Sequence, residues 1–465
     1  MPPRRPCTAT TSSSNKDGAR AGRSLACRVV VGMPGSTPYP VRVAVTTHSV
    51  PDICAAARRA GRELAQLDTA VKDAALEAMA CALMASIPEL LEANARDLEA
   101  GRENGLSASL LDRLALSEAR VAGMAAGVRA IAALADPVGE VVEGFRRPNG
   151  LDVRRVRVPL GVIAVVYEAR PNVTIDAAAL CLKSGNAIVL RGSSIAAHSN
   201  VALAALAAAA ATDAGVPEGA ISLVAGGGRE ELAELATQAG VVDLIIPRGG
   251  EGLKAALSAV ATVPVIYAAS GNCHVYVDSS ADLDAAQAII LNAKTQRPGV
   301  CNAAETLLVH SQAAPAFLPG ALRALIEAGV EIRADGRARA LAGAQAAKVS
   351  DATDEDWDTE YLALVLAVGV VDSVEEAIEH VNRHGSGHSE AILTRDTVAA
   401  RAFTHGVDAA CVYVNASTRF TDGGEFGMGA EIGNSTQKLH ARGPIGLREL
   451  CATKYVVEGD GHLRP

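Results

Sequence analysis

A regular alternation of short apolar runs with helical stretches, between residues 161 and 246, constrains the fold of this chain more than any other feature. Short buried strands that alternate with helices form right-handed β-α-β crossovers, and these crossovers build a parallel sheet. Ligands of such sheets bind beyond the carboxyl ends of the strands. The expected strands are residues 161–167, 187–190, 221–224 and 242–246, and the expected helices are residues 174–183, 200–213 and 229–238.

The segments on either side of this unit extend the α/β pattern. Four helices are expected before it, because apolar residues recur there at intervals of three and four. Residues 138–157 alternate between polar and apolar around a Pro148-Asn149-Gly150 turn, which is typical of a β-hairpin. From residue 275 to residue 420 the pattern is α/β again. The four expected helices are residues 53–67, 69–87, 88–101 and 117–134.

Composition and charge exclude several classes of partner. Of the 465 residues, 49% are hydrophobic and 20% are charged, which is the balance of a compact soluble protein. The formal net charge of −9 argues against nucleic acid or an anionic membrane as the main partner. No apolar run is long enough for a membrane helix, and residues 201–211 are expected to form a buried helix. The nine cysteines contain no Cys-x-x-Cys pair, so no metal site or disulfide framework is expected, which fits a reducing cytoplasm.

The first 52 residues differ from the rest of the chain. Up to residue 50 they hold seven basic residues and one acid, Asp17, together with a run of threonine and serine. A basic, serine-rich and acid-poor segment is compatible with a transit peptide, but it shows no amphipathic periodicity. A disordered extension, or a true start at Met33, fits equally well. We expect residues 1–52 to form an extension outside the folded domains.

Cys301 is the strongest candidate nucleophile. It follows a Pro298-Gly299 turn, stands close to Arg297 and precedes an apolar run at residues 306–309. A reactive thiolate needs partial exposure and nearby positive charge or amide donors, which this turn can provide. By spacing alone a buried structural cysteine is the better interpretation, because free cysteines are among the most buried residues.

A set of motifs makes the nucleophile the better interpretation of Cys301. They span residues 53–457, and together they resemble the gamma-glutamyl phosphate reductases of the aldehyde dehydrogenase superfamily. The motifs are Val158-Pro-Leu-Gly-Val-Ile163, Tyr167-Glu-Ala-Arg-Pro-Asn-Val-Thr174, Lys183-Ser-Gly-Asn-Ala187, Pro247-Arg-Gly-Gly250, Gly271-Asn-Cys-His-Val-Tyr-Val-Asp278, residues 294–305, Gly385-Ser-Gly-His-Ser-Glu390, Val414-Asn-Ala-Ser-Thr-Arg-Phe-Thr-Asp422 and residues 433–446.

The resemblance implies a fold and a division into domains. It implies an α/β, aldehyde dehydrogenase-like architecture with a parallel-sheet cofactor domain, an α/β catalytic domain and a small β flap that joins subunits into a homo-oligomer. The flap would pair the 138–157 hairpin with a C-terminal strand at residues 453–457. The expected segments are 53–137 and 158–270 for the NADPH-binding domain, 271–445 for the catalytic domain, and 138–157 with 446–460 for the flap.

The resemblance also implies an activity. Relatives are cytoplasmic enzymes of proline biosynthesis that reduce L-glutamyl 5-phosphate to L-glutamate 5-semialdehyde with NADPH and release phosphate. Cys301 would attack the acyl phosphate and form a thioester. Channelling of the substrate from glutamate 5-kinase is a further expectation.

One position separates this activity from hydrolytic oxidation. Hydrolytic aldehyde dehydrogenases use a glutamate to activate water, and the position matched to it here is Ala269. The missing base favours a reductase that exchanges phosphate. Two alternatives stay open: a hydrolytic semialdehyde dehydrogenase, and a non-catalytic member of the superfamily.

The oxyanion formed during attack needs hydrogen-bond donors. The resemblance points to the backbone amide of Cys301 and to an asparagine side chain. The alignment puts Arg170 at the asparagine position and Asn172 two residues later, so both are candidates. A turn role after Pro171 is an equal alternative for Asn172.

The chain lacks a G-x-G-x-x-G dinucleotide fingerprint. The resemblance places cofactor contacts in two turns and at one acid. An arginine in the first turn would bind a 2′-phosphate through two N–H groups and favour NADPH over NADH. The alternative is a surface arginine at the end of a strand. The candidate contacts are Arg191, Gly192, Ser193, Arg248, Gly249, Gly250 and Glu360.

A substrate with a phosphate and an α-carboxylate calls for cationic groups near Cys301. The candidates within matching motifs are Lys294, Arg297, Ser417, Thr418 and Arg419. Each cation can equally form a structural ion pair. His274, His388 and His440 are expected to be structural, because the chemistry needs no metal.

Overall fold

The computed structural model describes residues 49–226, 228–267 and 270–464. The expected extension, residues 1–52, therefore lies almost entirely outside the described residues, and so does Ala269. Contacts between Cα atoms group residues 46–465 into one unit, which contains every helix and strand below.

Helices form the first part of the described chain. Helix α1 (Val50–Leu64) begins where the Ser49 hydroxyl accepts from the amide of Asp52. Helices α2 (Thr69–Ala85), α3 (Ile87–Glu103) and α5 (Glu118–Ala132) lie where the apolar periodicity predicts them. Helix α4 (Ala108–Leu114) was not predicted.

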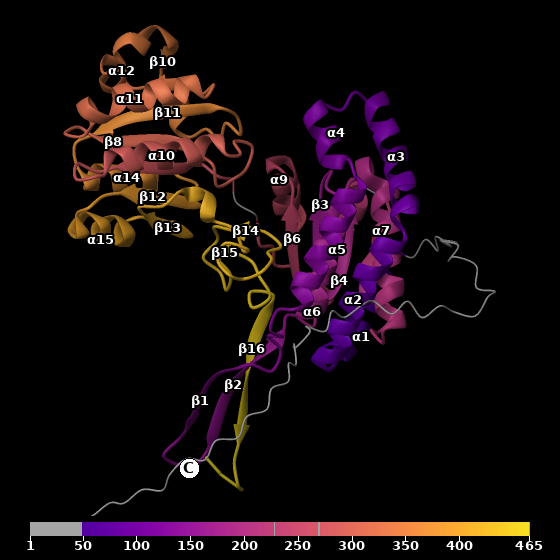
Figure 1. The fold of residues 1–465 in the computed structure, drawn as a ribbon. Coiled ribbons are helices and arrows are strands. Elements are labelled where there is room, and N and C mark those ends of the chain that lie inside the picture. The colour runs from indigo at the N-terminus through magenta and orange to yellow at the C-terminus, as the bar shows by residue number, and fades with distance from the viewer. Residues whose placement is uncertain (1–48, 227, 268–269, 465) are drawn as a thin grey trace, which may run out of the picture. The chain divides into compact units, whose positions relative to one another are not determined.

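A four-stranded parallel sheet follows, with the order β5-β4-β3-β6. Alternate residues of a strand point to opposite faces, so one set of β3 side chains packs with α2, α5, α6 and α7, and the other set packs with α1, α8 and α9. Both faces are covered, as a parallel sheet requires (Figure 1). The elements are β3 (Val162–Tyr167), α6 (Asn172–Lys183), β4 (Ala187–Gly192), α7 (Ala197–Asp213), β5 (Ile221–Leu223), α8 (Arg229–Ala236), β6 (Leu244–Arg248) and α9 (Glu251–Val260).

One described helical stretch, Ser194–Asp213, is long and apolar enough to cross a membrane by length and composition alone. Its residues 201–211 are the run expected from the sequence to form a buried helix. Its main part, α7, packs against α2, α3 and α6. Leu203, Ala204 and Ala207 are buried in the same hydrophobic core as the sheet, which is the position of a core helix.

A second, seven-stranded parallel sheet has the order β10-β9-β11-β8-β7-β12-β13. Helices α10 (Leu283–Thr295) and α11 (Ala314–Glu327) pack on one face, and α14 (Val374–His384) and α15 (Thr397–Gly406) pack on the other. The strands are β7 (Cys273–Val277), β8 (Ala304–His310), β9 (Glu331–Ala334), β10 (Val349–Asp351), β11 (Val365–Val371), β12 (Ser389–Leu393) and β13 (Cys411–Val414).

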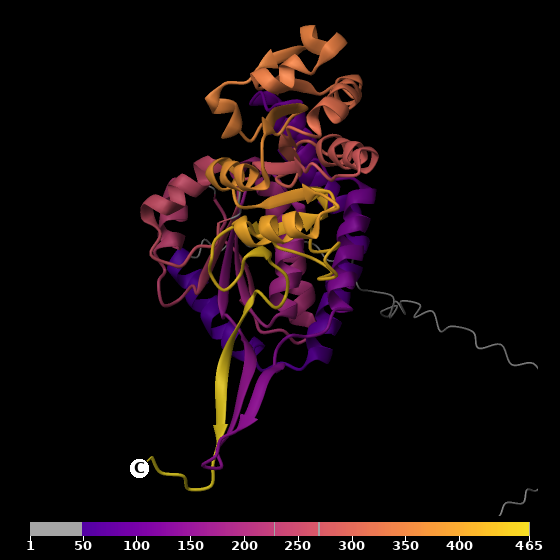
Figure 2. The same cartoon turned by 90° about the vertical axis from the view of Figure 1, so that its left-hand side faces the viewer.

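Two small antiparallel sheets complete the fold. Strands β1 (Val141–Arg146) and β2 (Asp152–Pro159) form the predicted hairpin, and β16 (Cys451–Glu458) pairs with β2 along its length (Figure 2). Strands β14 (Asn434–Ser435) and β15 (Gly443–Pro444) form the other sheet. The expected α/β architecture is confirmed, whereas the exact domain boundaries stay a prediction.

Candidate active site

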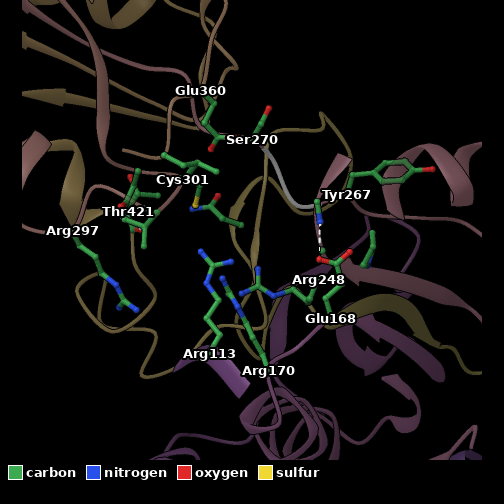
Figure 3. Close-up of a pocket in the computed structure, with 18 of the residues that line it drawn as sticks. Arg113, Glu168, Arg170, Arg248, Tyr267, Ser270, Arg297, Cys301, Glu360 and Thr421 are labelled. Carbon is green, nitrogen blue, oxygen red and sulfur yellow. Dashed lines mark hydrogen bonds between the residues drawn. The ribbon is translucent and has the colours of Figure 1, made fainter. Parts of the chain in front are cut away.

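A cavity of about 540 Å³ lies at the carboxyl ends of β3 and β6, the sheet edge where a ligand was expected (Figure 3). The second sheet supplies the opposite wall, through the segments that lead into β7 and β8. The titratable side chains around it are Cys301, Arg113, Arg170, Arg248, Lys254, Arg297, Arg419, Glu168, Glu360, Asp422, Glu431 and Tyr267.

Cys301 lies on the wall of this cavity, in the turn before β8, and its side chain is half-buried. Its backbone is fixed from several directions. The thiol of Cys273 donates to the Cys301 carbonyl oxygen at 3.2 Å. Next to it, the side-chain amide of Asn302 donates to the carbonyl oxygen of Thr421 at 2.9 Å, and the hydroxyl of Thr418 donates to the carbonyl oxygen of Asn302 at 2.7 Å. The thiol is therefore held on a rigid segment.

The charges around Cys301 act in opposite directions. Burial raises the pKa of the Cys301 thiol, and the positive charge of Arg248 lowers it. The carboxyl groups of Glu360 and Glu431 raise the same pKa further. The sequence analysis expected Arg297 to provide the positive charge, but Arg248 has the larger influence.

The five arginines of the cavity have no carboxylate partner among the described residues, unlike several arginines elsewhere in the chain. Arg58, Arg129 and Arg337, for example, each form an ion pair with a carboxylate. Among the described residues, no carboxylate lies within ion-pair distance of any of the five, which are Arg113, Arg170, Arg248, Arg297 and Arg419. Unpaired guanidinium groups that line a cavity are suited to bind an anionic ligand.

The carboxylates of the cavity accept hydrogen bonds from backbone amides instead. Each of the four accepts a hydrogen bond from a glycine N–H, so the acids hold the surrounding loops together. The pairs are Glu168 with Gly250 (3.4 Å), Glu360 with Gly271 (2.6 Å), Asp422 with Gly424 (2.8 Å) and Glu431 with Gly423 (2.9 Å).

The structure separates the predicted substrate contacts. Arg297 and Arg419 line the cavity. Lys294 does not: its side chain is fully buried in α10 and forms an ion pair with Glu305. Lys294 therefore has the structural ion pair that was the alternative to a substrate contact.

The two predicted hydroxyl contacts also lie outside the cavity lining, because both are used in local structure. Ser417 caps the short 3-10 helix η3 (Thr418–Phe420) by accepting from the amide of Arg419. Thr418 is fully buried and bonds to the Asn302 backbone. Their role as substrate contacts stays a prediction that the cavity lining does not support.

Of the two candidate donors to the oxyanion, one lines the cavity and the other does not. Arg170 lines the cavity, in the loop after β3. Asn172 is exposed at the start of α6, and its side-chain amide donates to Asp176 at 2.9 Å. The local structural role, which was the alternative for Asn172, matches this placement.

The predicted cofactor contacts fall into two groups. Arg248, Gly249, Gly250 and Glu360 line the cavity. The others lie at the carboxyl end of β4, outside the lining. There Arg191 donates to the carbonyl oxygen of Gly228 at 2.7 Å, and its buried Nε has no partner.

The remaining two residues at this end of β4 have structural reasons to be small or polar. A Cβ on Gly192 would lie 2.0 Å from the side-chain nitrogen of Asn200, so only glycine lets α7 approach the strand this closely. Ser193 accepts from the amide of Ile195 and caps the 3-10 turn η1 (Ser194–Ala196).

Comparison with known proteins identifies the family. The sequence model of the aldehyde dehydrogenase family matches residues 41–336 and 347–456. The chain belongs to the aldehyde dehydrogenase family. Members of this family use a nicotinamide cofactor. The expected aldehyde dehydrogenase-like fold is thereby confirmed.

Within the aldehyde dehydrogenases, the chain is similar to proteins named gamma-glutamyl phosphate reductase. The protein of that name from Moorella thermoacetica is 59% identical over 408 residues, which are 88% of this chain and 97% of that protein. The one from Heliobacterium modesticaldum is 56% identical over the same shares. The resemblance stated from the motifs is confirmed.

Solved structures agree with this placement. The crystal structure of gamma-glutamyl phosphate reductase from Thermotoga maritima has a TM-score of 0.88 at 46% identity, and the match covers 90% of this chain and 100% of that one. An acetylating aldehyde dehydrogenase from Geobacillus thermoglucosidasius, 20% identical with a TM-score of 0.63, shares the fold over 90% of this chain and 97% of its own.

Arg113, Glu431 and Asn434 are among the cavity residues of this aldehyde dehydrogenase that were not predicted as site residues from the sequence. Arg113 comes from the unpredicted helix α4, and Glu431 lies between the two motifs at residues 414–422 and 433–446. Asn434 is 5% exposed, and neither its side-chain oxygen nor its nitrogen has a hydrogen-bond partner. Buried polar groups normally find partners, so Asn434 is suited to bond a ligand in the cavity. Asn434 lies in the motif of residues 433–446, but nothing in the sequence distinguished it within that range.

Proposed function

We propose that this chain reduces L-glutamyl 5-phosphate to L-glutamate 5-semialdehyde and releases phosphate, as the second step of proline biosynthesis from glutamate. The observation that carries the proposal is the cavity in which the Cys301 thiol faces five arginines without carboxylate partners. A doubly anionic acyl phosphate complements such a site. The names of relatives above 50% identity support the same reaction.

In the proposed reaction Cys301 is the nucleophile. Its thiolate attacks the acyl carbon, a carbon–sulfur bond forms, and the carbon–oxygen bond to phosphate breaks with the electron pair leaving on phosphate. The positive charge of Arg248 favours the thiolate. Arg170 lies beside the same cavity and is the candidate donor to the oxyanion, together with the backbone amide of Cys301. Arg297 and Arg419 are the proposed substrate contacts.

We propose NADPH as the cofactor, since the residues at the sheet edge fit it. Arg191 keeps donors for a 2′-phosphate, because among the described residues its one hydrogen bond goes to Gly228 and its buried Nε has no partner. Gly249, Gly250 and Glu360 would hold the nicotinamide end. When bound, NADPH supplies the hydride that reduces the acyl carbon.

We further propose a cytoplasmic homo-oligomer that takes its substrate from glutamate 5-kinase and binds no nucleic acid. The β1-β2-β16 sheet would join the subunits, as the flap domain, while the four-stranded unit binds cofactor and the seven-stranded unit carries Cys301. Support comes from exposed apolar side chains on this sheet, which are unusual for a surface that faces water. They are Val141, Val142, Phe145, Tyr455 and Val457.

A steady-state assay in the reverse direction tests the proposed reaction. It supplies pyrroline-5-carboxylate, the cyclised semialdehyde, with NADP and varied inorganic phosphate. NADPH formation should require phosphate and should be abolished by Cys301→Ala. Cys81→Ala, at another half-buried thiol far along the chain in α2, is the matched control and should retain activity. Sustained turnover without phosphate would instead indicate a hydrolytic dehydrogenase.

A further inference from the structure

We propose that the cavity holds two separate anion subsites: Arg113, Arg170 and Arg248 bind the phosphoryl group, and Arg297 with Arg419 binds the α-carboxylate. The inference rests on the proposed function for the identity of the substrate. It adds Arg113 to the site, assigns Arg248 to the leaving group, and gives Arg170 a contact to the leaving group in addition to its proposed contact to the oxyanion.

The first subsite is assembled from three separate elements. Arg113 lies in the last turn of α4, Arg170 in the loop after β3, and Arg248 at the end of β6. Their guanidinium groups point toward one another below Cys301 (Figure 3). Burial lowers the pKa of Arg170, and the charges of Arg248, then Arg113, and then Arg297 lower it further, so the largest electrostatic effects on Arg170 come from the other two members of the group.

Like charges held together without counter-charges are unfavourable in a partly desolvated site. No described carboxylate forms an ion pair with these three arginines, and the acids of the cavity accept from glycine amides. Arg248 is attracted to carboxyl groups at longer range, those of Glu431 and Asp176. A bound dianion with three oxygens offsets the repulsion and accepts from several guanidinium forks at once.

The second subsite lies on the other wall. In Figure 3 the Arg297 side chain lies apart from the group of three, on the side of Thr421. Arg419 belongs to η3, and its Nε donates to Gln296 at 2.8 Å, which fixes the guanidinium. Burial, followed by the charge of Arg297, lowers the pKa of Arg419, so these two arginines act on one another.

The position of the thiol decides which subsite takes which anion. The phosphate is bonded to the carbon that Cys301 attacks, so it must lie next to the sulfur, whereas the α-carboxylate lies at the far end of the glutamyl chain. In Figure 3 the guanidinium groups of the three arginines lie below the Cys301 side chain, whereas Arg297 lies to one side. Arg248, a member of the group of three, also favours the Cys301 thiolate. The group of three is therefore the phosphoryl subsite.

Separate Michaelis constants in the reverse reaction test this division. Arg113→Gln should raise the KM for inorganic phosphate about ten- to hundredfold and leave the KM for pyrroline-5-carboxylate within about threefold. Arg297→Gln should do the opposite. Arg113→Lys, which keeps a charge, should recover part of the phosphate binding. Arg323→Gln, at an exposed position on α11, is the control and should change neither constant.

A second readout does not need turnover. Inorganic phosphate should protect Cys301 from alkylation by iodoacetamide, and Arg113→Gln should shift the half-protecting concentration upward by a similar factor. If the chain catalyses another reaction, this protection still tests the subsite, while the reverse assay tests the function. The proposal is overturned if Arg297→Gln, and not Arg113→Gln, weakens phosphate protection and raises the KM for phosphate. It is also overturned if phosphate gives no protection in the parent protein.

Discussion

Gly271 lies directly against the backbone of Cys301. A Cβ atom on Gly271 would stand 1.5 Å from the carbonyl oxygen of Cys301, a distance that no packing adjustment of side chains can relieve. Only the absence of a side chain at residue 271 lets the β7 segment support the nucleophile. The amide of Gly271 also donates to Glu360, so the same residue joins two parts of the site.

Gly271→Ala should therefore displace Cys301 and lower kcat by about a hundredfold, because an error of about 1 Å in the position of a reacting group has that effect. Gly123→Ala is the control: it makes the same substitution in α5, where an added Cβ meets nothing within 4 Å. It should retain activity and gain up to about 1 kcal/mol of stability. Steady-state kinetics and thermal melting measure both. Normal kcat for Gly271→Ala would refute the support role.

Asn434 provides a test in which stability and activity change in opposite directions. Its side chain is buried with both polar atoms unpartnered, so Asn434→Leu should stabilise the free protein by about 1 kcal/mol or more. The same change removes a ligand contact and should lower kcat/KM at least about tenfold. Urea unfolding and the reverse assay measure the two effects.

The control for Asn434 is a buried asparagine whose bonds are made. Asn186 accepts from the amide of Gly161 at 2.8 Å and donates to the carbonyl oxygen of Leu450 at 2.8 Å. Asn186→Leu should destabilise the protein by about 1–3 kcal/mol. If Asn434→Leu is equally destabilising, Asn434 is a structural residue.

Glu431 makes stability depend on pH. Burial, with a smaller effect of Asp422, raises the pKa of Glu431 from 4.5 to about 7. Between these two values the folded protein keeps a proton that the unfolded chain releases, so this contribution to stability is present below pH 4.5 and is lost as the pH rises through 7.

Glu431→Gln removes the titration and should therefore be more stable relative to the parent at pH 8 than at pH 5. The difference should change by on the order of 1–2 kcal/mol, after allowance for the partial exposure of the side chain. Urea unfolding of both proteins at several pH values measures it. Burial also raises the pKa of Glu305 to about 7, but Glu305 titrates in both proteins, so its contribution cancels in the difference between their stabilities. A difference that is constant with pH would contradict the prediction.

Arg191 tests the choice of cofactor. Arg191→Gln should raise the KM for NADPH about tenfold or more and change the KM for NADH by less than about threefold, because a guanidinium contact to a 2′-phosphate exists only with NADPH. Arg229→Gln, at an exposed arginine beside the same turn, should preserve the preference. An unchanged ratio in Arg191→Gln would place the 2′-phosphate elsewhere.

The sequence predicted the regular elements well because their periodicity is long and clear. Strands β3 and β4 and helices α2 and α5 begin and end within a few residues of the predicted positions. Helix α4 was missed, since seven residues span only two turns and carry little periodicity. Arg113 was missed with it.

The candidate site shows where sequence reasoning reached its limit. Lys294 and Arg297 are three residues apart in one motif, and spacing could not distinguish them. In the fold, α10 packs on β8 and buries Lys294 against Glu305, whereas Arg297 lies beyond the end of the helix and reaches the cavity. A partner that arises from tertiary packing leaves no local signal.

Rapid mixing of the enzyme with NADP and pyrroline-5-carboxylate, in the absence of phosphate, tests the central claim most directly. If Cys301 forms a thioester that phosphate must release, NADPH should appear in a single burst of about one equivalent per Cys301 and then stop. Addition of phosphate should restart turnover, and Cys301→Ala should show no burst. Sustained NADPH formation without phosphate, or a full burst in Cys301→Ala, would contradict the account.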